Sequence, residues 1–262
     1  MASGRMEFHA YSIMQHTNFA FVIPNDVEME EVRDLRHYDR ERYNIILLHG
    51  FTGTDTDWLY GGLAQDMAIQ FNLNVFMPAA NNTFYLDKGY MGAQWCEFIG
   101  SELPEYISKT LRVDMKRENT LIGGLSMGGF GALHTALAHP ENFSGCVALS
   151  SALIVHEYAK NAAHASDVVP YELMYDNFGD PAKVEASEKN PETLYLKLKE
   201  SGAEIPRLYF ACGLDDSLIP HNREFAAFLK AQGADYIYEE GPGAHNWRFW
   251  NEYLEKGLDR LL

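Results

Sequence analysis

The chain has 262 residues, a length typical of one or two domains, and α/β folds of this size are often single domains. Apolar residues make up 47% and charged residues 22%, which is ordinary for a globular protein and excludes a disordered or collagen-like chain. The net charge is −16, from 21 Lys and Arg against 37 Asp and Glu. Such a surface repels phosphate groups, so we expect no nucleic-acid partner and no membrane partner.

The cysteine content and the N-terminus bear on the compartment. Cys96, Cys146 and Cys212 are too few for a disulfide framework and lie in apolar runs, so we expect buried thiols. The N-terminus lacks the basic and apolar segments of a signal peptide. We therefore expect a cytoplasmic protein, or a secreted one if a leader has been removed. The sequence does not determine the oligomeric state and is compatible with a homo-oligomer.

The predicted elements begin with an antiparallel hairpin over residues 7–13 and 19–23, followed by a charged loop over 26–42. Continuous apolar runs then predict strands buried on both faces, as in a parallel sheet. These strands cover residues 43–50, 73–78, 120–125, 145–149 and 207–213, with a weaker one at 235–239. Helical spacing separates them at residues 58–71, 95–111, 129–139, 222–232 and 247–261. The alternation predicts an α/β fold, with a mostly parallel twisted sheet and helices on both faces.

Two features interrupt this pattern. Pro104 falls inside the second helix and is expected to kink or restart it. Residues 151–201 contain no convincing strand and are rich in Ala, Glu, Lys and aromatic side chains. We expect this stretch to be a helical cap insertion after the sixth strand, within a single domain that spans residues 1–262.

The strongest motif is a G-x-S-x-G pentapeptide from Gly124 to Gly128, which follows an apolar strand and precedes a helix-like segment. This context predicts a nucleophile elbow, a tight turn that exposes the oxygen of Ser126. Side chains at positions 124 and 128, two residues before and after Ser126, would collide in such a turn, which explains the glycine at both positions. The amides at the start of the following helix favour negative charge at the site.

A serine nucleophile needs a base and an acid, which follow it in chain order in this type of fold. His245 lies in a loop between the last strand and the last helix, where the base is expected. Two adjacent carboxylates follow the strand that ends at Gly213. The G-x-x-D spacing favours Asp216 over Asp215 as the acid.

The oxyanion hole requires two amide donors. We expect one to be the Met127 N–H, directly after the nucleophile, and the other the Phe51 N–H, in the loop after the first buried strand. His49 is expected to brace that loop. The sequence has no H-E-x-x-H motif, no paired C-x-x-C and no phosphate-binding loop, so we expect no metal and no cofactor.

Four segments together resemble the esterase D group of α/β-hydrolases, which includes S-formylglutathione hydrolases, tributyrin esterases and some feruloyl and acetyl esterases. They are His49-Gly-Phe-Thr-Gly, Gly124-Leu-Ser-Met-Gly-Gly-Phe-Gly-Ala-Leu, Cys212-Gly-Leu-Asp-Asp-Ser-Leu and Gly243-Ala-His-Asn-Trp-Arg-Phe-Trp. The resemblance runs from about Tyr11 to the C-terminus. It implies the same roles for Ser126, His245 and Asp216, and the same two oxyanion amides.

This chain departs from the S-formylglutathione hydrolase branch, which usually has Ser-Gly-Leu-Thr-Cys at the oxyanion loop and Ser-His near the base. We therefore predict a serine carboxylesterase that hydrolyses short-chain acyl or arylacyl esters, such as acetyl, butyryl and feruloyl or cinnamoyl esters, through an acyl-enzyme. Trp58 and the aromatic side chains of the insertion are candidates for the pocket wall. The alternatives are a glutathione-type thioesterase, a transferase to another alcohol and a non-catalytic scaffold.

Overall fold

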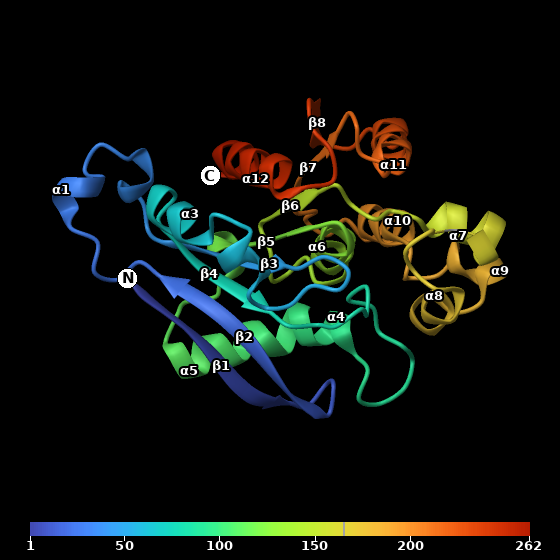
Figure 1. Ribbon diagram of the computed structural model, residues 1–262, viewed down its shortest axis with the longest axis horizontal. Helices are drawn as coiled ribbons and strands as arrows, with labels where there is room; N and C mark the ends of the chain where they lie inside the picture. The colour runs from blue at the N-terminus through green and yellow to red at the C-terminus, as the bar shows by residue number, and fades with distance from the viewer. Residues whose placement is uncertain (165) are drawn as a thin grey trace.

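The computed structural model describes residues 1–164 and 166–262, and these are arranged around an eight-stranded sheet (Figure 1). Strands β3 to β8 are parallel, whereas β1 and β2 form an antiparallel hairpin that extends the sheet beside β4. The strand order is β1-β2-β4-β3-β5-β6-β7-β8. The strands are β1 (Ala2–Ala10), β2 (Gln15–Ile23), β3 (Tyr43–Leu48), β4 (Leu73–Pro78), β5 (Thr120–Leu125), β6 (Gly145–Leu149), β7 (Arg207–Gly213) and β8 (Tyr236–Gly241). The mostly parallel sheet predicted from the apolar runs is confirmed.

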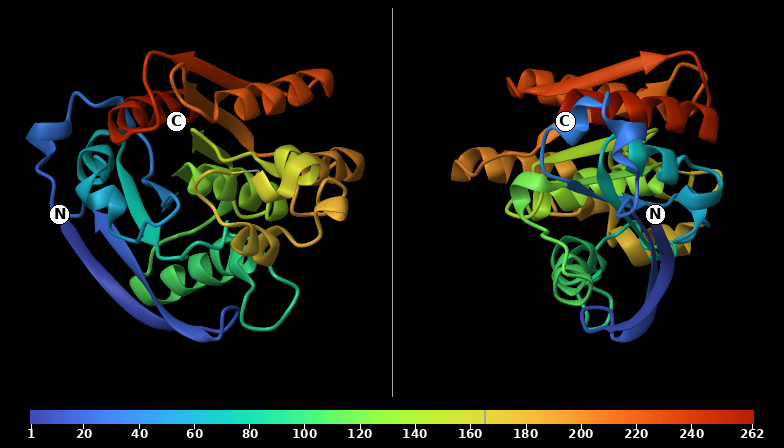
Figure 2. Two further views of the ribbon diagram at one scale, coloured as in Figure 1. Left: turned by 45° about the vertical axis from the view of Figure 1, so that its right-hand side comes forward. Right: turned by 90° about the vertical axis from the view of Figure 1, so that its left-hand side faces the viewer.

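Helices cover both faces of the sheet, because successive strand residues point to opposite sides (Figure 2). In β3, Ile46 and Leu48 join the core cluster that packs against α5 and α6, while Ile45 and Leu47 join the cluster beneath α3 and α12. The helices are α1 (Met29–Val32), α2 (Asp57–Tyr60), α3 (Ala64–Gln70), α4 (Trp95–Glu97), α5 (Leu103–Leu111), α6 (Met127–Ala138), α7 (Val155–Asn161), α8 (Tyr171–Phe178), α9 (Pro181–Val184), α10 (Pro191–Ser201), α11 (Ile219–Ala231) and α12 (Trp247–Leu261).

Pro104 does not break the helix that contains it. Residues 95–111 form one helical run in which a π-helical turn, η2 (Phe98–Glu102), lies directly before the proline. A proline has no N–H, so it cannot satisfy a carbonyl of the preceding turn. The Gly100 carbonyl instead accepts a hydrogen bond from Asn142 Nδ2 at 2.9 Å. The α-helical pattern therefore restarts at Leu103, with Pro104 in the first turn of α5, which is one of the two outcomes that the sequence predicted.

Other boundaries differ modestly from the predictions. The helix expected over residues 58–71 is two helices, α2 and α3, because a glycine pair separates them. A Cβ on Gly61 would lie 2.3 Å from the Trp247 ring, so the chain passes closer to α12 than a helix would allow. Between β6 and β7 the described residues are helical, in α7 to α10, and contain no strand, as predicted. All three cysteines are free and buried.

Candidate active site

Ser126 occupies a sharp turn between β5 and α6, with φ 57° and ψ −119°. Strand and helix cross so closely there that neighbouring side chains would overlap with backbone. A Cβ on Gly124 would lie 2.3 Å from the Gly128 carbonyl oxygen, and one on Gly128 would lie 2.4 Å from the Leu48 carbonyl oxygen. This geometry matches the nucleophile elbow predicted from the pentapeptide.

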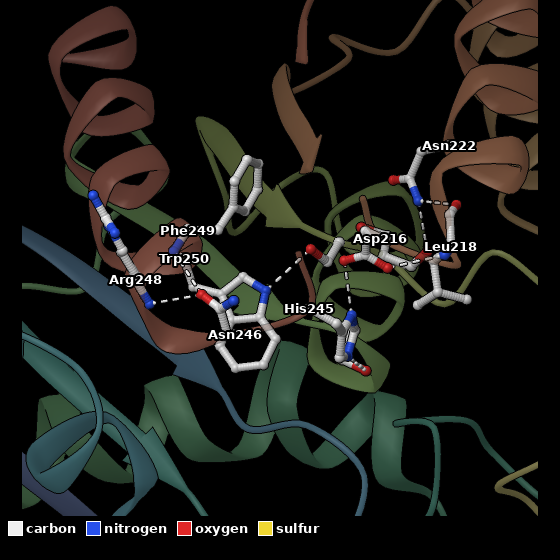
Figure 3. Close-up of polar contacts among 11 residues, drawn as sticks. Asp216, Leu218, Asn222, His245, Asn246, Arg248, Phe249 and Trp250 are labelled. Carbon is white, nitrogen blue, oxygen red and sulfur yellow. Dashed lines mark hydrogen bonds and ion pairs between the residues drawn. The ribbon is translucent and has the colours of Figure 1, made fainter. Parts of the chain in front are cut away.

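Two hydrogen bonds join Ser126, His245 and Asp216 in one chain. His245 lies in the loop between β8 and α12, and its Nε2 is 3.0 Å from Ser126 Oγ. Its Nδ1 is 2.9 Å from Asp216 Oδ2, in the loop after β7 (Figure 3). An ionised carboxylate can only accept, so Nδ1 carries the proton and Nε2 is left to accept from the serine hydroxyl. The three side chains therefore stand in the order that proton abstraction from Ser126 requires.

Asp216 is nearly fully buried, whereas the adjacent Asp215 is exposed. Burial raises the pKa of the Asp216 carboxyl, but hydrogen bonds from His245, from the Leu218 N–H at 2.9 Å and from Ser150 outweigh it and leave that pKa below its usual value. The carboxylate is thus ionised at neutral pH and able to hold a positively charged imidazole. Of the two adjacent carboxylates, Asp216 is the one that contacts His245, and Asp215 is exposed.

A cavity of about 530 Å³ opens beside Ser126. Both residues expected to supply the oxyanion amides, Phe51 and Met127, contribute to its wall. The remaining wall is mainly apolar with a few polar groups, and consists of Thr52, Phe84, Ala152, Ile154, residues 166–169, Ser217, Leu218, His221 and His245. A cavity of this size and composition is typical of a site for a small organic substrate.

His49 braces the loop that carries Phe51. Its side chain is fully buried, and the Ala80 N–H donates to its Nε2 at 3.0 Å. The proton therefore sits on Nδ1, which donates to the Gly50 carbonyl at 2.8 Å. Burial lowers the pKa of His49, so the ring is neutral. His49 fixes the loop, as predicted, and does not line the cavity.

Trp58 does not line the cavity, and the prediction that it does is wrong. Its side chain is fully buried, and its Nε1 donates to the Leu48 carbonyl at 3.0 Å. The ring packs edge-to-face against Trp247, with centroids 5.1 Å apart. The aromatic residues of the insertion are also absent from the wall among the described residues, because Tyr171 and Tyr175 face solvent and the others lie in the core.

The cavity includes residues that no motif singled out. From the insertion come Ile154 and residues 166–169, and from the first turn of α11 comes His221. His221 follows Asp216 by five positions, but no pattern in the sequence shows that any of these residues faces the cavity. Among residues 1–164 and 166–262, no cluster of His, Cys, Asp and Glu could hold a metal ion.

The fold and this site define a class of protein. A serine turn between a parallel strand and a helix, followed in chain order by a buried carboxylate and a histidine, is characteristic of α/β-hydrolases. Within that class, the chain belongs to the esterase family, whose sequence profile matches residues 36–261.

Individual relatives agree with this assignment. An acetyl esterase of Caldicellulosiruptor saccharolyticus is 37% identical over 265 residues, which cover 99% of this chain and 97% of that protein. The S-formylglutathione hydrolase structure from Staphylococcus aureus superposes with a TM-score of 0.83 at 23% identity, covering 99% of this chain and 98% of that one. A ferulic acid esterase structure gives a TM-score of 0.74 at 20% identity, covering 99% and 96%. The family resemblance predicted from the motifs is confirmed, and the two structures share the fold.

Proposed function

We propose that this protein is a serine carboxylesterase that hydrolyses short-chain acyl esters through an acyl-enzyme on Ser126. The observation that carries the proposal is the hydrogen-bonded chain from Asp216 through His245 to Ser126, which ends at a cavity of about 530 Å³. The relative named as an acetyl esterase supports acetyl esters as the first substrates to test. Arylacyl esters such as feruloyl esters come second.

In the acylation step, His245 Nε2 takes the hydroxyl proton as Ser126 Oγ attacks the ester carbonyl carbon. Asp216 holds the imidazole through Nδ1 and stabilises its positive charge. The carbonyl oxygen becomes an oxyanion, for which we propose the N–H groups of Phe51 and Met127 as donors. When the intermediate collapses, His245 returns the proton to the departing alcohol and the acyl group stays on Ser126.

In the deacylation step, water replaces the alcohol. His245 removes a proton from the water, which attacks the acyl-enzyme, and a second oxyanion forms at the same two amides. Its collapse releases the carboxylic acid, and His245 returns the proton to Ser126. The reaction therefore needs no group beyond those of the chain and a water molecule.

The test is hydrolysis of p-nitrophenyl acetate, butyrate, octanoate and ferulate by the wild type and by Ser126→Ala. We expect the substitution to lower kcat by about 10⁴-fold or more, with unchanged circular dichroism. A variant that retains a tenth of wild-type activity would contradict the nucleophile assignment. An S-formylglutathione arm tests the thioesterase alternative, and we expect it to be the poorer substrate. If a fluorophosphonate probe does not label the wild type at Ser126, the scaffold alternative replaces the proposal.

The proposal also covers the domain organisation and the location of the protein. We infer that residues 1–262 form one domain and that residues 151–201 act as its cap, which is supported by the place of Ile154 and Val169 in the cavity wall. A cytoplasmic location remains a prediction from the sequence. None of the helices in the described residues is long and apolar enough to cross a membrane.

A further inference from the structure

Two buried polar side chains, Ser150 and Trp250, lie behind Asp216 and His245 and take no part in the steps above. The Ser150 side chain is fully buried, and Trp250 is 7% exposed. Trp250 Nε1–H donates to Ser150 Oγ at 3.0 Å. The Trp250 ring also meets the His245 ring edge-to-face, with centroids 5.0 Å apart and planes at 90° (Figure 3). One tryptophan therefore touches the base directly and reaches the acid side of the site through a serine.

The chemistry of the two side chains fixes the direction of the hydrogen bond between Trp250 and Ser150. An indole N–H can only donate, so Ser150 Oγ accepts from Trp250 and its own proton is free for another neighbour. The Asp216 carboxylate can only accept, and hydrogen bonding from Ser150 is one of the contacts that lower its pKa. The buried Cys212 thiol also contacts Ser150, and burial together with Asp216 raises the pKa of Cys212 to about 12, so it stays neutral. Asp216 is therefore the charged group on which the Ser150 hydroxyl acts, and Trp250 holds that hydroxyl in place.

The backbone fixes Ser150 in this place. Its φ of 45° lies in the left-handed region, which a serine rarely adopts, directly after β6. Its N–H donates to the Ala211 carbonyl of β7 at 2.7 Å. The residue is held in an unfavourable conformation between the end of β6 and β7, the strand that leads into the acid loop. Strained backbone conformations of this kind cluster at functional sites, which points to a role for the direction of the Ser150 side chain.

We propose that Trp250 and Ser150 are positioning residues, which together hold the Asp216 carboxylate and the His245 ring at the distance and angle that proton transfer from Ser126 requires. The inference rests on the proposed function. The Trp250 ring limits rotation of the imidazole, and the hydrogen bond from Trp250 fixes the Ser150 hydroxyl on the acid side of the site. A single tryptophan therefore couples the acid to the base without touching the substrate.

The test uses three variants of the full chain. Ser150→Ala and Ser150→Gly both remove the hydroxyl, and glycine also relieves the left-handed backbone. If the hydroxyl matters, both lower kcat by about 10- to 100-fold with little change in KM, as loss of a hydrogen bond to a charged group should. Trp250→Phe keeps a ring beside His245 but removes the donor, and we expect a loss of about 10-fold. Trp247→Phe, which packs against Trp250 with centroids 5.2 Å apart, is the matched control and should stay within about twofold.

Two further measurements separate positioning from general loosening. The acid limb of the kcat/KM profile reports protonation of the base that Asp216 holds, so removal of the Ser150 hydroxyl should shift that limb in both serine variants. The double variant Ser150→Ala/Trp250→Phe should be no slower than Ser150→Ala, because both changes interrupt one chain. Equal losses at every pH, or fully multiplicative effects, would overturn the proposal.

The outcome stays distinct from that of the proposed function. An inactive wild type that a fluorophosphonate does not label contradicts the esterase proposal itself. An active wild type whose Trp250→Phe and Ser150→Gly variants match it in kcat and in pH profile contradicts only the positioning role. If Ser150→Ala fails to fold, Ser150→Gly and Trp250→Phe still decide the question, since glycine tolerates the left-handed backbone and phenylalanine keeps a ring in the core.

Discussion

Ser126 lies at the edge of the sheet formed by the carboxyl ends of the parallel strands. This edge and the helical segment at residues 151–201 are held in place by different kinds of interaction. At the edge, backbone meets backbone across glycines, and a Cβ on Gly124 or Gly128 would lie within 2.5 Å of a carbonyl oxygen. Because no side chain fits at either glycine, close packing of backbone against backbone fixes the conformation of this region, which we call steric exclusion.

The helical segment has a buried apolar side, but several of its attachments are polar side-chain bonds. His134 Nε2 on α6 lies 2.9 Å from the Glu188 carbonyl, and Asn177 Nδ2 donates to the Asn82 carbonyl at 2.9 Å. His156 pairs with Glu185 and Glu192, all within the segment. The contacts made by the two histidines respond to pH, whereas close backbone contacts do not. The comparison predicts large, pH-independent damage at the edge and smaller, pH-dependent effects in the segment.

The largest effect is expected at the acid. Asp216→Asn removes the charge that holds the His245 tautomer, and we expect kcat to fall by about 10³- to 10⁴-fold. Asp215→Asn, one position earlier and exposed, is the matched control and should change kcat less than twofold. Steady-state kinetics on p-nitrophenyl acetate decide between them. The reverse ranking would transfer the role to Asp215.

The next effect tests steric exclusion. Gly128→Ala places a Cβ 2.4 Å from the Leu48 carbonyl oxygen, so strand and helix must move apart, and we expect a loss of about 3 kcal/mol in the free energy of unfolding. Gly202→Ala is the control, because its Cβ would meet nothing within 4 Å and only its φ of 70° is unfavourable, which costs about 1 kcal/mol. Urea unfolding at two pH values measures both. Equal losses would show that crowding at the elbow is not limiting.

The sequence predicted the edge well because its constraints are local. A glycine two residues either side of Ser126, a strand before it and a helix after it can each be read from neighbouring letters. The order of Asp216 and His245 follows from the fold, and the exposed position of Asp215 agrees with the spacing argument. The strand boundaries followed from apolar runs that only a parallel sheet can bury on both sides.

The sequence failed where the answer depends on contacts between distant segments. Trp58 follows the oxyanion loop and is aromatic, yet α2 turns it into the core beside Trp247, 189 positions away. Ser150 carries no motif, and its importance depends on a tryptophan of α12. The break at Gly61 depends on the same helix. The spacing of residues along the chain does not show which aromatic ring from a distant segment a residue will contact.

The third prediction concerns the junction between α6 and the segment. Burial lowers the pKa of His134 to about 4, against 6.5 in the unfolded chain. The unfolded state then binds the proton more tightly, so stability is complete above pH 6.5 and falls as pH decreases toward 4, by roughly 3 kcal/mol at the limit. His134→Gln should remove this part of the acid destabilisation.

Chemical denaturation from pH 4.5 to 8 compares wild type, His134→Gln and the exposed control His9→Gln. The stability difference between wild type and His134→Gln should shrink or reverse as pH falls, while His9→Gln follows the wild type. A constant difference across this range would mean that His134 has the same pKa in the folded and unfolded states.

The smallest effect has the opposite sign and lies within the segment. Burial alone would lower the pKa of His156, but its bonds to Glu185 at 2.6 Å and Glu192 at 3.2 Å outweigh burial and raise that pKa. A raised pKa means that the folded state binds the proton more tightly, so this stabilisation is full below pH 6.5 and disappears as pH rises through the folded value. His156→Gln should therefore destabilise the protein by up to about 1 kcal/mol at pH 6 and by much less at pH 8.5. Two histidines, one buried at the junction with the core and one half-buried inside the segment, would then give opposite pH slopes. If both variants show the same slope, the segment is not held by the charges assigned to it, and its packing against α6 must account for its stability.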